Sequence, residues 1–338
     1  MTFTDNVEYS PFLEWNRNDP FTVDSVAHTF KSLVTMVKDN FQFDEEHVQK
    51  VSMFLSSMNR NLFRENFVDS FLNTIEQDTT NSTTVFVNSI IVLLSSSHLS
   101  IFRDTLALLP PFLNHTGLTN RLVLVSSQLI PRILSTPRLR DLSVIMDKSI
   151  MDNIISIFRN CILLPSTTNT QSISALSHTN SQYVSDIVLH EVLIPIEPSL
   201  VQITRNSLLL SFFMQYKATV YLFSNIFEIS SFHQPTLDFV CSSRIPMLYQ
   251  SLLTDVEDDS KHQFIFWIMS NNFVKWKTNE TETAKSGKRL LETLECEGCL
   301  DLIEQRQLCH NSSPNGSCVR VYAFKITNIL GTNPQRLV

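Results

Sequence analysis

Glycine is scarce in this chain, with five positions among 338 residues, although average usage of about 7% would supply several times as many. Phosphate-binding loops, nucleophile elbows and tight β-hairpins need glycine where φ is positive or where the backbone approaches a ligand closely. The sequence contains no G-x-S-x-G, no G-x-x-x-x-G-K-[ST] and no H-E-x-x-H pattern. These absences argue against the common hydrolase and nucleotide-binding classes, so we expect a protein that is not an enzyme and that binds no cofactor.

Charge is also sparse, because 17% of the residues are charged and the formal net charge is −7. Binding to nucleic acid requires a broad cationic face that neutralises phosphates. The basic residues gather only in small groups, which are typical of solvated helix surfaces. These groups are Arg132, Arg138 and Arg140, and then Lys285, Lys288 and Arg289. We therefore expect no nucleic-acid partner.

Two stretches bear on the location of the protein in the cell. The first residues, MTFTDNVEYSPF, carry acids and lack the apolar core of a secretory signal. Together with six cysteines that are expected to be reduced thiols, they predict a cytoplasmic protein, and a nuclear location is left open. Residues 208–227 are long and apolar enough for a membrane span, but Lys217 near their centre would cost about 2.5–3.5 kcal/mol in lipid. We expect a buried helix there and no membrane span.

Phenylalanine is abundant, with 24 positions, and hydrophobic residues make up 43% of the chain. Apolar residues recur at helical spacing along most of the sequence, which predicts an all-α fold. Phe63, Phe67 and Phe71 follow one another at intervals of four, so we expect a buried stripe rather than an exposed binding patch. The first four apolar stripes lie within residues 23–37, 48–58, 63–75 and 87–94.

The predicted helices number about 12–15 in one domain over residues 1–338, ordered from about residue 20 to residue 335. Asp44, Glu45 and Glu46 suit a helix start, where carboxylates meet the positive end of the helix dipole. Residues 76–84 are an expected loop, and the low-complexity stretch 165–181 is an expected flexible loop. Further helices are predicted over 98–109, 117–129, 141–163, 182–194, 200–229, 235–243, 247–254, 260–276, 282–295, 298–308 and 317–330.

One short pattern occurs twice, in residues 122–134 (LVLVSSQLIPRIL) and 237–249 (LDFVCSSRIPMLY). In both, an isoleucine–proline step follows a helical stretch, at Pro131 and at Pro246. The residue before proline is disfavoured in the α region, and proline at the first helical position loses nothing by lacking an N–H group. We therefore predict a helix–turn–helix joint at each position, and a third joint at Pro110.

These joints resemble the armadillo repeat, in which a hydrophobic-Pro-x-hydrophobic step opens a helix. A second armadillo-like element, a hydrophobic residue followed two positions later by asparagine, occurs at Asn160, Asn225 and Asn328. The chain is also similar over nearly its whole length to a set of uncharacterised armadillo/HEAT-like proteins from protists. The segments that carry this similarity are YSPFLEWN (9–16), QPTLDFV (234–240), EGCLDLIEQ (297–305) and ILGTN (329–333).

The resemblance implies an armadillo/HEAT-like α-α superhelix, or solenoid, with degenerate repeats, because a regular spacing of about 40 residues is missing. For a chain of this fold without catalytic motifs, we expect a non-catalytic scaffold that binds protein or peptide partners along a concave helical surface. Inward asparagines of armadillo proteins hydrogen-bond an extended peptide, which makes Asn160, Asn225 and Asn328 candidate partner-binding residues. The alternative is that these are ordinary surface or interhelical asparagines. The resemblance carries no enzymatic activity with it, and it leaves the partner and the oligomeric state open.

A cluster of four cysteines and a histidine offers a second hypothesis, a structural zinc site. Zinc takes four thiolate or imidazole ligands in a tetrahedron, often opened by C-x₂-C. The later spacing matches no zinc module, and a redox C-x-x-C pair would be expected after a strand, so free thiols are the other interpretation. An enzyme of unrecognised type is a third hypothesis, which no sequence feature supports. The cluster consists of Cys296, Cys299, Cys309, His310 and Cys318.

Overall fold

The computed structural model describes residues 9–64, 66–76, 82–163, 178–205, 217–230 and 233–254, and residues 292, 293, 298, 301 and 302. All regular secondary structure in these ranges is helical, which confirms the all-α prediction. The chain divides into two compact units, Met1–Cys161 (unit 1) and Ile162–Val338 (unit 2). The single continuous domain expected over residues 1–338 stays a prediction.

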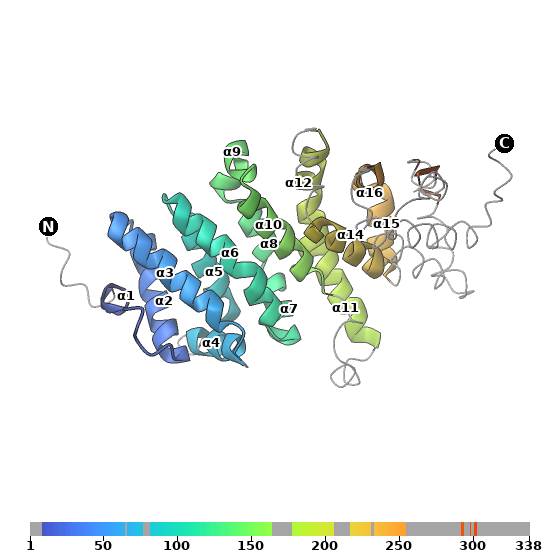
Figure 1. Ribbon diagram of the computed structural model, residues 1–338. Helices are drawn as coiled ribbons and strands as arrows, with labels where there is room; N and C mark the ends of the chain where they lie inside the picture. The colour runs from blue at the N-terminus through green and yellow to red at the C-terminus, as the bar shows by residue number, and fades with distance from the viewer. Residues whose placement is uncertain are drawn as a thin grey trace, which may run out of the picture. The chain divides into compact units, whose positions relative to one another are not determined.

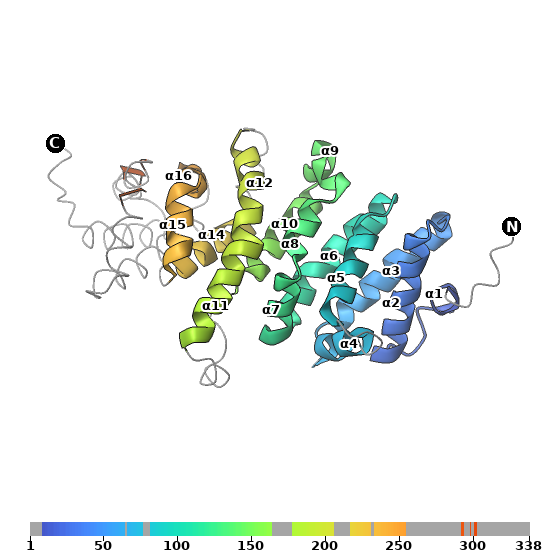
Figure 2. The ribbon, with the colours of Figure 1, turned by 180° about the vertical axis from the view of Figure 1, so that it is seen from behind.

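Unit 1 is built from helices stacked in two layers. Its elements are α1 (Ser10–Glu14), α2 (Val23–Lys38), α3 (Glu45–Asn61), α4 (Phe67–Glu76), α5 (Ser82–Leu94), α6 (Leu99–His115), α7 (Leu118–Ser126), α8 (Leu129–Leu134), η1 (Pro137–Arg140), α9 (Leu142–Ile145) and α10 (Lys148–Cys161). Figure 1 shows α3, α6 and α10 side by side, and α6 contacts both of the others. Figure 2, seen from behind, shows α2, α5 and α7 side by side in the second layer, where α5 contacts both neighbours.

Phenylalanine rings fill the space between the layers of unit 1. Phe86 of α5 stacks on Phe112 of α6 with ring centroids 4.4 Å apart, and it contacts Phe30 of α2 at 6.1 Å. Phe71 of α4 meets Phe86 edge-on at 6.2 Å. All four rings are fully buried, and burying a side chain of this size stabilises the fold by about 1.5–3 kcal/mol. These rings therefore hold α2, α4, α5 and α6 together.

The expected stripe over residues 63–75 is wrong at its first residue. α4 begins at Phe67, because Asn66 adopts a left-handed backbone conformation with φ of 58° and interrupts the helical path. Phe67 and Phe71 are buried, whereas Phe63 is 69% exposed and meets the ring of His115 at 4.7 Å. Intervals of four place residues on one face only where the helix is continuous.

Left-handed backbone positions in the described residues are filled largely without glycine. Asn40, Asn66 and Gln128 have φ values of 55°, 58° and 60°. Asparagine tolerates this region better than most residues, because its short amide can hydrogen-bond the nearby backbone. The low glycine content therefore does not prevent sharp turns between the helices of unit 1.

The helix expected to end at residue 109 continues instead, and no joint forms at Pro110. α6 contains both Pro110 and Pro111, although a proline in a helix interior removes a backbone donor and costs about 3 kcal/mol. Leu109 and Phe112, on either side of the prolines, are fully buried, so packing favours the continuous helix. Asn160 of α10 also stabilises this segment, because its Nδ2 donates a 2.8 Å hydrogen bond to Pro110 O.

The two isoleucine–proline joints are confirmed, with a small shift in register. α7 gives way to α8 through Gln128, and Pro131 is the third residue of α8 rather than the first. In unit 2, α15 (Gln234–Ser242) is followed by α16 (Ile245–Thr254), with Pro246 as its second residue. Proline is tolerated throughout the first turn, because N–H groups there have no intrahelical acceptor.

The single helix expected over residues 141–163 is broken in two at Asp147. Its Oδ1 accepts hydrogen bonds from the backbone N–H groups of Ser149 (2.9 Å) and Ile150 (3.2 Å), which starts α10. Aspartate competes well for the free N–H groups at a helix start, so it ends one helix and begins another. Its other oxygen accepts a 2.9 Å hydrogen bond from Arg103 Nη2, which ties α10 to α6.

The first described helices of unit 2 form one continuous helical path, where the sequence predicted two separate helices. α11 (His178–Val188), the π-helical turn η3 (Leu189–Leu193) and α12 (Ile194–Arg205) run on without a break, so the interruption expected between residues 194 and 200 is wrong. Pro198 lies inside α12. Buried apolar side chains continue on both sides of the turn, and they hold the path together through its prolines. These side chains are Val188, Leu189, Val192, Leu193, Ile196 and Leu200.

The remaining helices of unit 2 pack on this path and on one another. α14 (Lys217–Ser230) contacts α15, while α16 contacts α12 and α15. Within the described ranges, no helix combines the length and the apolar character needed to cross a membrane.

Several predictions fall wholly or partly outside the described residues. Of the expected loop 165–181, residues 178–181 are helical, and residues 165–177 lie outside. Residues 208–216 of the apolar stretch also lie outside. The same holds for the helices expected over 260–276, 282–295, 298–308 and 317–330, apart from short helical pieces at 292–293 and 301–302.

Candidate functional site

Unit 1 contains a cleft of about 510 Å³ between two of its turns. One turn, residues 39–43, joins α2 to α3, and the other, residues 95–98, joins α5 to α6. Both turns lie at the upper ends of these helices in Figure 1. A volume of several hundred Å³ is typical of pockets that hold small ligands or side chains of a partner.

The first wall of the cleft is set by the way α2 ends. The backbone N–H of Asn40 donates to Val37 O at 3.2 Å, and that of Phe41 donates to Met36 O at 2.9 Å. This pair of bonds forms the Schellman motif, which needs a left-handed residue, here Asn40. The motif reverses the chain, so the rings of Phe41 and Phe43 line the cleft.

Aromatic rings are concentrated on this turn. Phe41 meets Phe43 at 5.2 Å, His47 at 5.4 Å and Tyr9 at 5.9 Å. Phe43 also reaches the ring of His98 at 5.9 Å, which joins the two walls. Edge-on ring pairs at such distances add about 0.5–1.5 kcal/mol beyond the burial of their area. The cleft therefore has aromatic faces that are held in place before a ligand arrives.

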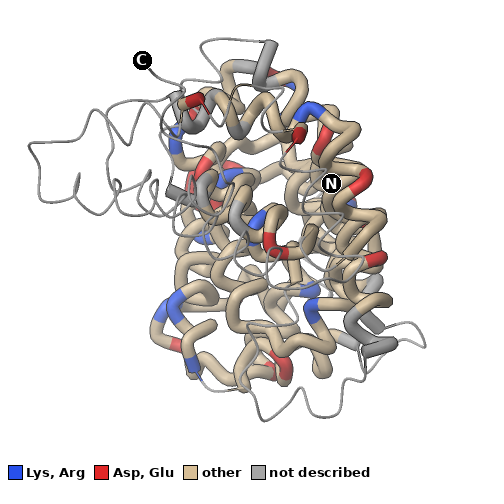
Figure 3. The backbone as a smooth tube through the Cα atoms, turned by 90° about the vertical axis from the view of Figure 1, so that its right-hand side faces the viewer, with Lys and Arg blue, Asp and Glu red and all other residues tan. Residues whose placement is uncertain are grey.

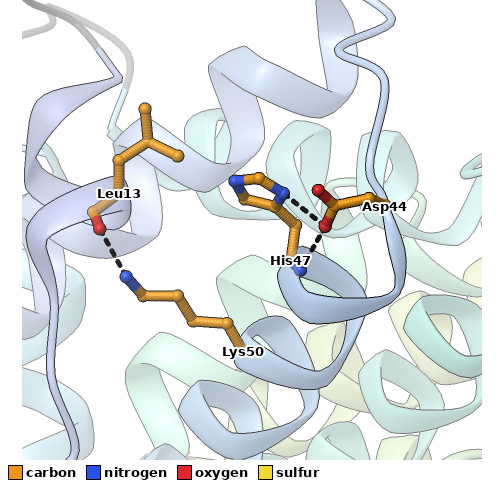
Figure 4. Close-up of polar contacts among 4 residues, drawn as sticks. All are labelled: Leu13, Asp44, His47 and Lys50. Atoms are coloured by element: carbon orange, nitrogen blue, oxygen red, sulfur yellow. Dashed lines mark hydrogen bonds and ion pairs between the residues drawn. The ribbon is translucent and has the colours of Figure 1, made fainter.

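The turn passes into α3 through a charged cap. Asp44 Oδ1 accepts a 2.9 Å hydrogen bond from the backbone N–H of His47 and lies 2.6 Å from His47 Nδ1 (Figure 4). Hydrogen bonds from His47 hold the pKa of Asp44 below its ordinary value, so the carboxylate is ionised at neutral pH. The expectation for residues 44–46 is confirmed, because Asp44 is the N-cap and Glu45 and Glu46 lie in the first turn.

The second wall is the end of α5 and the serines that follow it. Ile91 and Val92 supply an apolar surface, and Ser95 Oγ donates a 2.8 Å hydrogen bond to Ile91 O. Ser95 and Ser97 are exposed and present hydroxyl groups at the rim. Across the cleft the rim carries the exposed Lys38 with the amides of Asn40 and Gln42, and the described lining residues include no carboxylate.

The neighbouring gap in unit 1, between the turn 95–98 and η1, is closed by a side chain. Arg138 Nε donates a 3.1 Å hydrogen bond to Ser96 O, and its Nη2 donates to Ser97 O. The guanidinium carbon lies 5.9 Å from the ring centroid of Phe102, which is a cation–π distance. The expectation of a merely solvated arginine group is wrong for Arg138, because it binds this turn and is half-buried.

Two further helix ends in unit 1 carry a cation. Lys50 Nζ donates to Leu13 O near the end of α1 (Figure 4) and lies 5.8 Å from the ring centroid of Phe12. Burial lowers the pKa of Lys50, against the opposing influence of nearby carboxylates. Arg121 Nη2 donates a 3.0 Å hydrogen bond to Thr116 O at the end of α6. Cations at these positions meet the negative end of the helix dipole.

The candidate asparagines have different surroundings. Asn160 is buried in unit 1, where its Nδ2 donates to Pro110 O and its Oδ1 accepts from Arg159 Nε at 3.1 Å. This geometry favours the interhelical interpretation for Asn160. Asn225 lies half-buried on α14 of unit 2, and Asn328 lies outside the described residues. Partner binding by these asparagines stays a prediction.

The predicted zinc ligands Cys296, Cys299, Cys309, His310 and Cys318 all lie outside the described residues. In the part of the chain that the structure describes, no group of three or more His, Cys, Asp or Glu side chains is arranged to hold a metal ion.

Of the two described cysteines, Cys161 is a buried free thiol and Cys241 is partly exposed. Burial raises the pKa of Cys161 to about 12, although the positive charge of Arg121 opposes the shift. The Cys161 thiol is therefore protonated at neutral pH and is a poor nucleophile. This residue serves packing rather than chemistry.

One histidine of unit 2 lies between a carboxylate and a hydroxyl group. His233 Nε2 is 3.1 Å from Asp186 Oδ1, and His233 Nδ1 is 2.7 Å from Thr236 Oγ1. Nucleophilic hydrolases use these three kinds of group in the same order. Here His233 is 1% exposed and Thr236 is 0% exposed, so a substrate does not reach the hydroxyl. Burial lowers the pKa of His233 despite Asp186, and the neutral ring ties the start of α15 to α11.

Basic and acidic residues are interspersed along the described backbone in Figure 3. For the described residues, this arrangement does not contradict the prediction of no nucleic-acid partner. That prediction stays untested. No model of a known protein family matches the chain, and no curated protein matches it. The resemblance to armadillo/HEAT-like proteins of protists therefore stays a prediction.

Sequence reasoning missed the cleft. The available signal was the segment FQF at residues 41–43, two aromatic residues directly before the acids that start α3. Aromatic residues in a turn have no helical face to occupy, so they pack at the ends of helices instead.

Proposed function

We propose that this chain is a non-catalytic protein-interaction scaffold of the cytosol, with an armadillo/HEAT-like arrangement of helices. The observation that carries the proposal is the cleft between the turns 39–43 and 95–98. It combines half-buried rings with hydroxyl and amide groups, which is the chemistry of a surface that holds a segment of another protein.

The preorganisation of the cleft supports binding rather than catalysis. Its rings are fixed by Tyr9, His47 and His98, and its turn is fixed by the Schellman motif at Asn40. Surfaces that are ordered before binding lose little entropy when a partner docks. The two-layer packing of unit 1 supports the armadillo/HEAT-like part of the proposal, because such proteins stack helix pairs so that successive turns meet along an edge.

Site-specific photo-crosslinking tests this function. A benzophenone amino acid replaces Phe43 in the cleft, and in a matched protein it replaces Phe63, an exposed ring outside the cleft. After irradiation in lysate of the source cell, mass spectrometry identifies the captured proteins and the crosslinked peptides. We expect specific proteins at position 43 that are absent at position 63. Equal capture at both positions, or none at position 43, would contradict the proposal.

A pair of serine variants shows whether the captured proteins occupy the cleft. Ser95 and Ser126 are both exposed at a helix end, and each hydroxyl donates to a carbonyl of its own helix. Ser95→Lys places a bulky charge on the rim, whereas Ser126→Lys places it outside the cleft. Capture at position 43 is expected to fall with Ser95→Lys and to persist with Ser126→Lys. Loss with both variants would show that added charge alone prevents capture.

The zinc hypothesis rests on the sequence pattern from Cys296 to Cys318 and has its own test. Metal analysis of the purified full chain is expected to give one zinc per chain if the pattern binds metal. A metal content far below one per chain would leave the thiols free and would not affect the proposal for the cleft.

A further inference from the structure

We propose that the cleft between the turns 39–43 and 95–98 binds an arginine side chain carried on an extended segment of a partner protein. This inference rests on the proposed function and specifies the chemistry of the segment that docks.

The neighbouring gap supplies the first argument. The turn 95–98 forms a wall of both gaps, and on its far side the guanidinium of Arg138 already donates to two of its carbonyl groups beside the ring of Phe102. Lys50 joins a carbonyl near a helix end and a phenylalanine ring in the same way. Unit 1 therefore twice combines a cation, a carbonyl at a helix end and an aromatic ring. The cleft offers the rings beside two helix ends, where the carbonyl groups of Met36, Val37 and Val92 already accept backbone hydrogen bonds. A guanidinium in the cleft would therefore use side-chain oxygens as acceptors, and the lining cation, Lys38, is exposed.

The groups that line the cleft fit the parts of an arginine side chain. Ile91 and Val92 suit its methylene stem, since long basic side chains pack their stems on apolar surfaces. The rings of Phe41 and Phe43 suit its planar guanidinium, which stacks on aromatic faces. Side-chain oxygens of the amides and serines at the rim can accept its N–H groups, because guanidinium offers five donors and no acceptor.

The charge around the cleft favours a cation over an anion. Residues 38–47 contain one lysine and four carboxylates, a formal charge of −3 with His47 neutral, whereas residues 91–98 contain no Lys, Arg, Asp or Glu. Arg138, which binds the turn 95–98, brings the sum to −3 + 1 = −2. The carboxylates of this segment are close in sequence to lining residues and do not line the cleft themselves, so their charge favours a cation without filling the space. They are Asp39, Asp44, Glu45 and Glu46. A segment with an acidic side chain would be repelled by the same charges.

A matched pair of small probes tests the arginine assignment on the full chain. N-acetyl-arginine N-methylamide is titrated against N-acetyl-citrulline N-methylamide, which has nearly the same shape and no charge, and ligand-observed NMR follows binding in the millimolar range. We expect saturable binding of the arginine probe and about fivefold weaker binding of the citrulline probe, because charge-assisted hydrogen bonds are roughly twice as strong as neutral ones. Equal binding of the two probes, or no saturable binding of either, would overturn the assignment.

The serine variants locate the bound probe. Ser95→Lys is expected to weaken the arginine probe severalfold, because it adds a positive charge at the rim, and Ser126→Lys is expected to leave it unchanged. An equal effect of both variants would place the probe outside the cleft and overturn the proposal. The crosslinked peptides separate this inference from the proposed function. Proteins captured at position 43 through segments without arginine would refute the inference and leave the scaffold role standing.

Discussion

Two neighbouring gaps of unit 1 share one wall and differ in what fills them. Between the turn 95–98 and η1, Arg138 donates to Ser96 O and Ser97 O and closes the space. Between the turns 39–43 and 95–98, the structure has a cleft of about 510 Å³ lined by Phe41 and Phe43. The space between two turns at helix ends is therefore either bridged from within the chain or left open as a cleft.

The two gaps also differ in the residues that the chain places beside them. η1 carries Arg138 directly opposite the turn 95–98, whereas the turn 39–43 carries aromatic and amide side chains and holds Lys38 at the exposed rim. We call the cleft between the turns 39–43 and 95–98 the first gap, and the space between the turn 95–98 and η1 the second gap. An internal arginine makes the second gap part of the fold. The first gap is supported by the fold without being filled by it, and this property distinguishes a candidate binding site from a structural contact.

Removal of a core ring between α2, α5 and α6 is expected to destabilise unit 1 most. Phe86→Ala is expected to destabilise the protein by about 3–5 kcal/mol, because it leaves a cavity at a fully buried ring. Phe86 contacts Phe30 of α2 and Phe112 of α6, so its loss weakens the packing between the helices that carry the turns 39–43 and 95–98. Chemical denaturation followed by far-ultraviolet circular dichroism measures the change.

The matched control for this substitution is Phe63→Ala, which removes the same ring from a surface position. Phe63 is 69% exposed, so a change below about 0.5 kcal/mol is expected. Similar losses of stability on substitution of Phe63 and Phe86 would contradict the assignment of Phe86 to the core. They would also contradict its role in holding together the helices that carry the two turns.

A second substitution changes only the gap that Arg138 bridges. Arg138→Ala is expected to destabilise unit 1 by about 1–2 kcal/mol, because it removes two hydrogen bonds from a half-buried charged donor and a contact with Phe102. Arg140 is exposed on the same short element, so Arg140→Ala is expected to change stability by less than about 0.5 kcal/mol. Thermal unfolding of the three proteins measures both changes.

A small cation tests whether Arg138 acts through its guanidinium. In the Arg138→Ala protein the second gap becomes empty like the first, so methylguanidinium at millimolar concentration is expected to restore part of the lost stability. The Arg140→Ala protein is expected to show no such gain. Failure of rescue, with the protein still folded, would show that Arg138 acts through its tether to η1 rather than as a guanidinium bound in a gap.

The sequence predicts the helices of unit 1 well, because their apolar spacing survives in the folded chain. The stripe over residues 23–37 lies in α2, and residues 87–94 lie in α5 although their β-branched content would also suit a strand. The breaks are harder, because Asn66 and Asp147 interrupt helices through local hydrogen bonding and backbone conformation that the spacing of apolar residues does not report. Pro110 shows the reverse case, in which packing overrides a strong local signal to stop.

The candidate site was much less predictable than the helices, since it is made by contacts between distant segments. Arg138 donates to a carbonyl 42 positions earlier in the chain, and Phe43 meets His98 across the two walls. Neither contact follows from the residues next to it in sequence. The armadillo-like pattern drew attention to Asn160, whose amide is instead used within the fold.

In acid, the helix start beside the first gap is expected to loosen while the bonds of Arg138 across the second gap persist, and this is the weakest of the predicted effects. Because its folded-state pKa is lowered, Asp44 contributes its stabilisation fully above about pH 4, and this contribution is lost as the pH falls through the folded pKa. The start of α3 is then expected to loosen beside the first gap, and the arginine probe to bind more weakly. The pKa of Asp141 is lowered by hydrogen bonds from Ser143, so the start of α9 follows the same course.

The hydrogen bonds of Arg138 run to backbone carbonyl groups and do not involve Asp44, so they are expected to persist across the second gap while the cap of α3 is lost. NMR shifts of the amide proton of His47, measured against pH, follow the cap directly. Asp44→Asn provides the control, because asparagine caps helices well and does not ionise. An unchanged titration of the His47 amide in the Asp44→Asn protein would show that another group controls the acid response of this turn.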